Sequence, residues 1–147
     1  MSMRLAFAML ADAASVADGK LYVHGGGWNQ LTVDRLPTVH PSLAVVFVLE
    51  MTASDNDEAL PLSVELGCES GPLATMQGTL QPALGDGTAP LGPFMLAQAV
   101  TLTQVPLPVV GDYQVRVVCA GTELGAVQLS VALATGTAPP DGHTTLD

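Results

Sequence analysis

The residues with the clearest chemical signature are His24 and the three glycines at 25–27. A histidine followed by glycines imitates the oxyanion loop of lipases and esterases, which works together with a nucleophile elbow of the form Gly-x-Ser-x-Gly. The nearest match to that elbow is residues 67–71, where Glu69 occupies the position of the serine. An esterase-like hydrolase is therefore only the third hypothesis, and the sequence predicts no catalytic residue and no enzyme.

A structural role explains the same run better. Gly25, Gly26 and Gly27 follow a predicted strand, and consecutive glycines permit a bulge or a sharp bend there. Trp28 comes next and is placed to cap the core. No Gly-Lys-Ser/Thr follows and no helix begins, so a phosphate loop is excluded. We predict that residues 18–28 form a strand and a glycine-permitted bend, which mark the fold rather than a site.

The acidic residues of the loops are the candidate metal ligands. Asp55, Asp57 and Glu58 lie together in one loop, and Asp86 lies in another loop, whose convergence on the first would bring the four side chains together. A Ca²⁺ site needs six or more oxygen ligands, and the spacing of a calcium loop is incomplete here. The three histidines match no zinc spacing. We therefore favour a solvated turn and predict no cofactor, while a sandwich that binds Ca²⁺ or a carbohydrate stays as the alternative function.

Cys68 and Cys119 are too few for a disulfide framework. In an oxidising compartment they can form one bond, whereas buried free thiols are the expectation for a cytosolic chain. The sequence leaves their pairing open.

The charge of the chain limits its partners. Asp and Glu number 14 against 4 Lys and Arg, which gives a net charge of −10. The basic residues are scattered, so no basic stripe can neutralise phosphates, and nucleic acid and anionic membrane surfaces are excluded as partners. The apolar segment at residues 5–11 imitates a short signal peptide, but we interpret it as the first strand. No apolar run approaches the roughly 20 residues of a membrane span, and we expect a cytoplasmic location.

Alternation of apolar and polar residues, interrupted at short intervals by turn residues, predicts an all-β fold. We expect a single antiparallel β-sandwich, immunoglobulin-like or C2-like, over residues 1–134, followed by a C-terminal tail at 135–147. Residues 113–119 and 126–133 should form a hairpin. In the first strand, Leu5, Phe7 and Met9 should point inward. The order Pro-x-x-Gly-x-Tyr, with Gly111 and Tyr113, predicts a tyrosine corner.

Residues 43–49 are apolar on both faces of the strand that they predict. Such a strand is central to its sheet and is covered on both sides. Val46 and Val48 on its outer face are therefore candidate interface residues. Charged residues make up only 12% of the chain, whereas about 25% is usual. The leading hypothesis is a non-enzymatic protein-interaction or assembly module, with a protein partner or self-association.

Several of these motifs together resemble those of a known family. They are the run at residues 18–21, the Gly-Gly-Gly-Trp run at 25–28, the strand that Gly111 and Tyr113 open, and the turn at 121–125. This combination resembles a family of small bacterial proteins described as a domain of unknown function, over about residues 5–133. No catalytic residue is assigned to the motifs. The resemblance implies a cytoplasmic bacterial β-sandwich and leaves the activity open.

Overall fold

The computed structural model describes residues 3–52, 59–80 and 93–134. Within them the chain forms β-strands only, in agreement with the predicted all-β class. The strands are β1 (Met3–Ala17), β2 (Lys20–Trp28), β3 (Gln30–Val33), β4 (Thr38–Met51), β5 (Leu60–Cys68), β6 (Gly71–Leu80), β7 (Phe94–Leu107), β8 (Gly111–Cys119) and β9 (Thr122–Leu133). In the same part of the chain, no helix is long and apolar enough to cross a bilayer.

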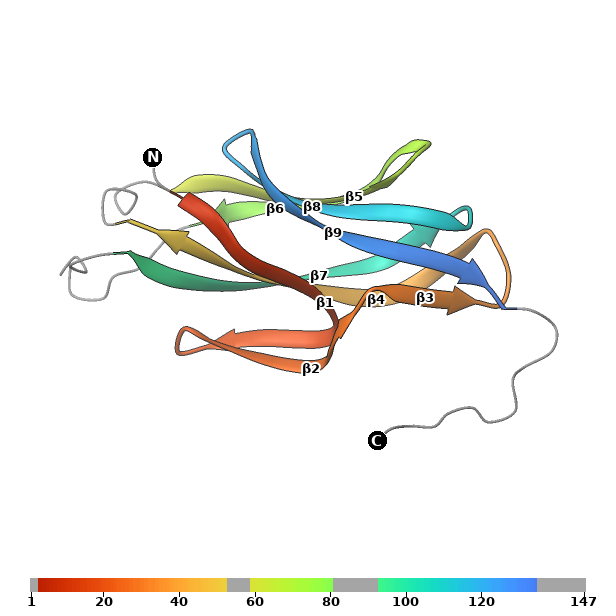
Figure 1. Cartoon of the computed structure of the whole chain (residues 1–147), viewed down its shortest axis with the longest axis horizontal. Coiled ribbons are helices and arrows are strands. Elements are labelled where there is room, and N and C mark those ends of the chain that lie inside the picture. The colour runs from red at the N-terminus through yellow and green to blue at the C-terminus, as the bar shows by residue number, and fades with distance from the viewer. Residues whose placement is uncertain (1–2, 53–58, 81–92, 135–147) are drawn as a thin grey trace.

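The strands form two sheets that pack face to face, as the predicted sandwich requires (Figure 1). One sheet has the order β2-β1-β4-β7, and the other has the order β3-β9-β8-β5-β6. Alternate side chains of the central strands fill the space between the sheets. The largest fully buried ones include Phe47 from one sheet and Tyr113 from the other. Between the described strands, every ladder is antiparallel except that of β3 with β9, which is parallel.

Two hairpins use the same turn chemistry. Asp18 (φ 51°) and Gly19 (φ 71°) connect β1 to β2, and Ala120 (φ 50°) and Gly121 (φ 83°) connect β8 to β9. Two consecutive residues with positive φ are the mark of the type I′ turn, whose twist matches that of the strands. The predicted hairpin between residues 113–119 and 126–133 is confirmed, with β9 beginning four residues earlier.

The prediction for the first strand was wrong for two of its three inward residues. The register of β1 against β4 shifts between Leu5 and Phe7. This β-bulge inserts one extra residue, so Leu5 faces the core while Phe7 lies on the outer face and is 44% exposed. Met9 likewise packs with the outer-face residues Ala11 and Val46. Strict alternation along a strand fails at a bulge, and this bulge has no clear signal in the sequence.

Tyr113 forms the predicted corner. Its hydroxyl donates to the carbonyl oxygen of Val109 at 2.6 Å and accepts from the N–H of the same residue at 3.2 Å. Its ring is fully buried. Gly111 before it has a φ of 123°, which favours glycine. The hydroxyl thus joins the loop before β8 to the core.

Tyr113→Phe should lower the free energy of unfolding by about 1 to 2 kcal/mol, because two backbone groups of Val109 lose their side-chain partner while the packing is kept. Urea denaturation followed by circular dichroism measures the change. Tyr22→Phe is the control, because that ring is 51% exposed. Equal losses in the two variants would contradict the role of the corner.

Two buried side chains that lose a proton at alkaline pH, the Cys119 thiol and the Tyr113 phenol, should make the stability of the fold depend on pH. Burial raises the pKa of the Cys119 thiol above its ordinary value of 9.0. Burial also raises the pKa of Tyr113 above 10.0, against the lowering effect of its hydrogen bond to Val109. Both groups thus hold their protons more tightly in the folded chain than in the unfolded chain. The stability that they contribute is complete below their ordinary pKa values and is lost as the pH rises through the folded values.

The free energy of unfolding should therefore fall above about pH 9 because of these two groups. Urea titrations at pH 8.0 to 10.5 measure the slope. Cys119→Ala should flatten it between about pH 9 and 10, whatever its effect on stability at pH 7. A slope that is unchanged in Cys119→Ala would show that the thiol does not contribute.

Candidate functional site

A hollow of about 720 Å³ opens beside β5 and β8 in the five-stranded sheet. Gly67 belongs to its lining and shares a face of β5 with Ser63 and Glu65, since these three residues alternate with the buried Val64 and Leu66. The position of Gly67 is crowded from the side, because an added Cβ would lie 3.2 Å from the carbonyl oxygen of Gly71. Because Gly67 has no side chain, nothing projects from this position into the hollow, whereas Ser63 and Glu65 on the same face carry polar side chains.

Polar side chains of two strands line the hollow beside Gly67. Gln114 of β8 lies opposite Gly67 on one side and opposite Gln128 of β9 on the other. Both glutamines line the hollow together with Asp112. Neither carboxamide forms a hydrogen bond with another residue of the described part of the chain. The arrangement offers two amide donors, two amide acceptors and a carboxylate to a polar ligand.

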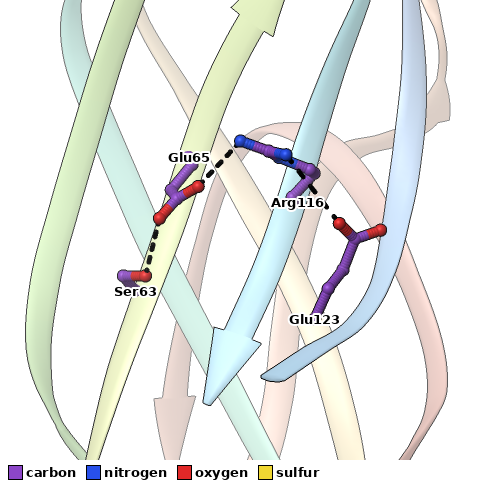
Figure 2. A network of polar contacts seen from close by, with 4 residues as sticks. All are labelled: Ser63, Glu65, Arg116 and Glu123. Carbon is purple, nitrogen blue, oxygen red and sulfur yellow. Dashed lines mark hydrogen bonds and ion pairs between the residues drawn. The ribbon is translucent and has the colours of Figure 1, made fainter. Parts of the chain in front are cut away.

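Arg116, which also lines the hollow, is held by two carboxylates (Figure 2). Its Nη2 lies 2.9 Å from Oε1 of Glu65, and its Nη1 lies 3.9 Å from Oε1 of Glu123. Ser63 Oγ donates to the second oxygen of Glu65 at 3.3 Å. The guanidinium is 41% exposed, so the pairs add little stability. Two acidic partners compensate its charge, which makes the hollow a poor site for a phosphate or another anion.

The outer face of the four-stranded sheet is apolar. We define the apolar face as Phe7, Met9, Ala11, Ala44, Val46, Val48, Met95, Ala97 and Ala99, which lie on β1, β4 and β7 in matching register. Met9 and Ala99 lie opposite Val46 from the two sides, and Phe7 and Ala97 lie opposite Val48. The sequence-based prediction that the strand of residues 43–49 is apolar on both faces and central therefore holds.

The solvent-exposed side chains of the apolar face are not Val46 and Val48, the interface candidates from the sequence. Val46 is 0% exposed and Val48 is 9% exposed, because neighbouring side chains cover them. The predicted interface candidates are thus buried within the chain and supply little contact area themselves. The exposed large side chains of this face are Phe7 (44%) and Met95 (61%). Any partner of the face would contact these two residues first.

Charge on the apolar face is balanced. Arg4 of β1 and Glu50 of β4 lie opposite each other and form an ion pair. Asp12, which directly follows Ala11 on β1, is the other Asp, Glu, Lys or Arg of these two strands. The nine residues of the face are themselves uncharged, and the ion pair at its border has no net charge, which leaves the face compatible with association.

The glycines of the predicted bend lie within β2 rather than after a strand. Gly25 (φ 62°) and Gly27 (φ 89°) have left-handed backbones, and the register with β1 shifts between Leu10 and Ala11. The predicted bulge is therefore present, inside an unbroken strand. The indole Nε1 of Trp28 donates to the Gly25 carbonyl oxygen at 2.8 Å, and the ring packs against the main core.

His24 lies on β2 opposite Ala13, on an exposed stretch. Residues 67–71, the other half of the hydrolase hypothesis, form the end of β5 and its turn into β6, so the strand-to-helix elbow is not formed. Cys68 and Cys119 are both free thiols, and Cys68 Sγ lies 3.0 Å from Ser70 Oγ. This geometry gives no support to an oxyanion loop.

The four candidate metal ligands, Asp55, Asp57, Glu58 and Asp86, lie outside the described residues, as does the predicted tail at 135–147. Among the residues that the structure describes, no group of three or more His, Cys, Asp or Glu side chains could hold a metal ion. The Ca²⁺ alternative therefore stays a prediction.

The hollow was missed by the sequence analysis. The polar alternation at 63, 65 and 67, and at 112, 114 and 116, was a sufficient signal for a wet face on each strand. Its position depends on the register that places Gly67, Gln114 and Gln128 in one row, and register is not encoded in the alternation.

Two solved structures match the chain over most of its length. An alkylpurine DNA glycosylase from Pseudomonas fluorescens, bound to DNA containing an abasic site analog, has a TM-score of 0.49 and 12% sequence identity. The match covers 88% of this chain and 30% of the glycosylase chain. An immunoglobulin-like protein from Pseudomonas aeruginosa has a TM-score of 0.41 and 9% identity, with 89% of this chain and 97% of that chain covered.

No curated protein matches the sequence. The model of the family of unknown function DUF6941 matches residues 6–132. This match confirms the resemblance that the motifs indicated, and the chain belongs to the DUF6941 family.

Proposed function

We propose that the chain is a non-enzymatic module that binds another protein through its apolar face. The observation that carries the proposal is the combination on one sheet of a continuous apolar surface, exposed anchors at Phe7 and Met95, and a balanced ion pair at Arg4 and Glu50. Exposed apolar anchors beside a buried apolar surface are typical of protein interfaces. The other outer face, with Gln114, Arg116 and Gln128, is polar instead.

Site-specific photo-crosslinking in the native cell tests the proposal. A benzoylphenylalanine placed at position 7, or at position 95, should give discrete adducts whose cross-linked peptides mass spectrometry identifies. The matched control is the same residue at Gln77, which is exposed on β6 of the other sheet. Absence of adducts at positions 7 and 95, or the same adducts from position 77, would contradict the proposal.

A second candidate function, binding of a small polar ligand, is favoured by the hollow beside Gly67. Its lining offers amides and carboxylates but no aromatic ring on which a sugar could stack. A ligand would therefore be recognised by hydrogen bonds. Calorimetry with a panel of neutral sugars tests this function, with Gln128→Leu expected to abolish the heat and Gln77→Leu, outside the hollow, expected to preserve it. No heat from any member of the panel would count against a sugar ligand.

A further inference from the structure

The described strands leave four sheet edges, which belong to β2 and β7 in one sheet and to β3 and β6 in the other. The N–H and C=O groups along such an edge are open to pairing with another strand, and proteins usually protect them. β7 is the longest of them, with 14 residues, and like β3 and β6 it carries no charged side chain. It lies near β6 across the sandwich, but no ladder joins the two strands.

The other three edges carry protection of the usual kinds. β2 begins at Lys20 and is distorted by its glycines, and β3 has only 4 residues. β6 has 10 residues, with Pro72 at its second position and Gly78 near its other end, which leaves a shorter regular edge than that of β7. In β7 the corresponding devices stand only near its end, where Gln104 has a φ of 52° and Pro106 lacks an N–H. Residues 94–103 therefore form a regular, uncharged edge, and none of the described strands pairs with its outer side.

The regular part of β7 is ordered by its inner neighbour. It pairs continuously with β4, from Phe94 opposite Met51 to Thr103 opposite Ser42. The backbone of β7 is thus already extended. Pairing with a further strand would therefore cost less conformational entropy than the ordering of a flexible segment. Addition of a strand to a sheet edge is an established mode of protein recognition.

We propose that this edge pairs with the same edge of a second copy of the chain, so that two four-stranded sheets join into one continuous sheet across a two-fold axis. The inference goes beyond the proposed function, because it concerns the edge of the sheet rather than its apolar face. A two-fold axis places β7 antiparallel to itself, which is the geometry of an isologous contact.

Electrostatics favours a second copy at this place. Each chain carries a net charge of −10, and most surfaces of two copies would repel each other. Residues 94–107 contribute none of that charge. Pairing at β7 also brings together the Met95 side chains and the neighbouring Ala97 and Ala99 of the two copies, which extends the apolar face across the dimer.

Light scattering coupled to size-exclusion chromatography tests the proposal. The full chain is measured at concentrations from about 1 to 200 μM. We expect a dimer whose dissociation constant rises by about tenfold or more in Thr101→Lys, since the interface carries the added charge twice. Thr101 is exposed on the outer side of β7, opposite Ala44. The matched control is Thr79→Lys, at an exposed position of the edge strand β6, which should leave the dimer unchanged.

Phe7→Ser separates edge pairing from association of the apolar face, because Phe7 lies on β1 in the interior of the sheet. A dimer that Phe7→Ser keeps and Thr101→Lys weakens supports the proposal. A dimer that Phe7→Ser or Thr79→Lys disrupts equally overturns it, although the former result leaves the proposed function standing. A wild-type monomer at every concentration also overturns it, and photo-crosslinking at position 7 then decides the proposed function independently.

Hydrogen exchange on the wild-type chain gives a second measurement that needs no substitution. Amide protection in residues 94–103 should rise with protein concentration, while protection in β6 should not. Protection of both strands that is independent of concentration would overturn the proposal even if Thr101→Lys did not fold.

Discussion

Replacing Val46 with aspartate should lower the free energy of unfolding by about 3 to 5 kcal/mol. Val46 lies on an outer face of the sandwich, where a charged residue would ordinarily be tolerated. It is nevertheless 0% exposed, between Met9 of β1 and Ala99 of β7. A carboxylate there would lose its hydration and would have no cation beside it, since the strand positions opposite it are apolar.

Urea denaturation at pH 7.5 measures this loss. Gln114→Asp is the matched control, because Gln114 is an exposed residue on the outer face of the other sheet. It should change the free energy by less than about 1 kcal/mol. A loss below about 1 kcal/mol in Val46→Asp would show that water reaches this part of the apolar face.

Replacing Trp28 with alanine should lower the free energy of unfolding by about 3 kcal/mol, the low end of the range for buried tryptophan because the ring is only partly buried. Trp28 lies opposite Leu10 and packs against the main core. It also closes the left-handed turn of backbone at Gly25 through its indole N–H. The substitution removes both the packing and this hydrogen bond.

Trp28→Phe separates the two contributions. It retains an aromatic ring and loses the hydrogen bond to Gly25, so about 1 to 1.5 kcal/mol should be lost. Tyr22→Ala is the control for the loss of an aromatic residue from β2, because Tyr22 lies on the same strand and is 51% exposed. If Trp28→Phe were as destabilising as Trp28→Ala, the hydrogen bond rather than the packing would be the main contribution.

Much of the fold could be predicted from the sequence because it rests on local patterns. Alternation gave β5, β8 and β9, and the pair Ala120 and Gly121 gave the hairpin between the last two. The glycine before Tyr113 indicated the corner, which a hydrogen bond to Val109 forms. Each of these features depends on residues that are close together in the chain.

What could not be predicted depends on the pairing of distant segments. The bulge near Phe7 changes which side chains of β1 face the core, and nothing in the alternation of small and large apolar residues marks it. The burial of Val46 comes from neighbours on β1 and β7, so a strand that is apolar on both faces does not reveal how much of its outer face water can reach. The row of Gly67, Gln114 and Gln128 is likewise a product of register between three strands.

The parallel ladder of β3 and β9 has a consequence for the time course of folding. It pairs Gln30 with Ser130 and Val33 with Leu133, so each contact closes a loop of about 100 residues. During synthesis, β3 can pair only after residues 130–133 of β9 have left the ribosome. The ladder between β3 and β9 should therefore form among the latest events of folding. A chain that ends before β9 would lack the partner strand of β3.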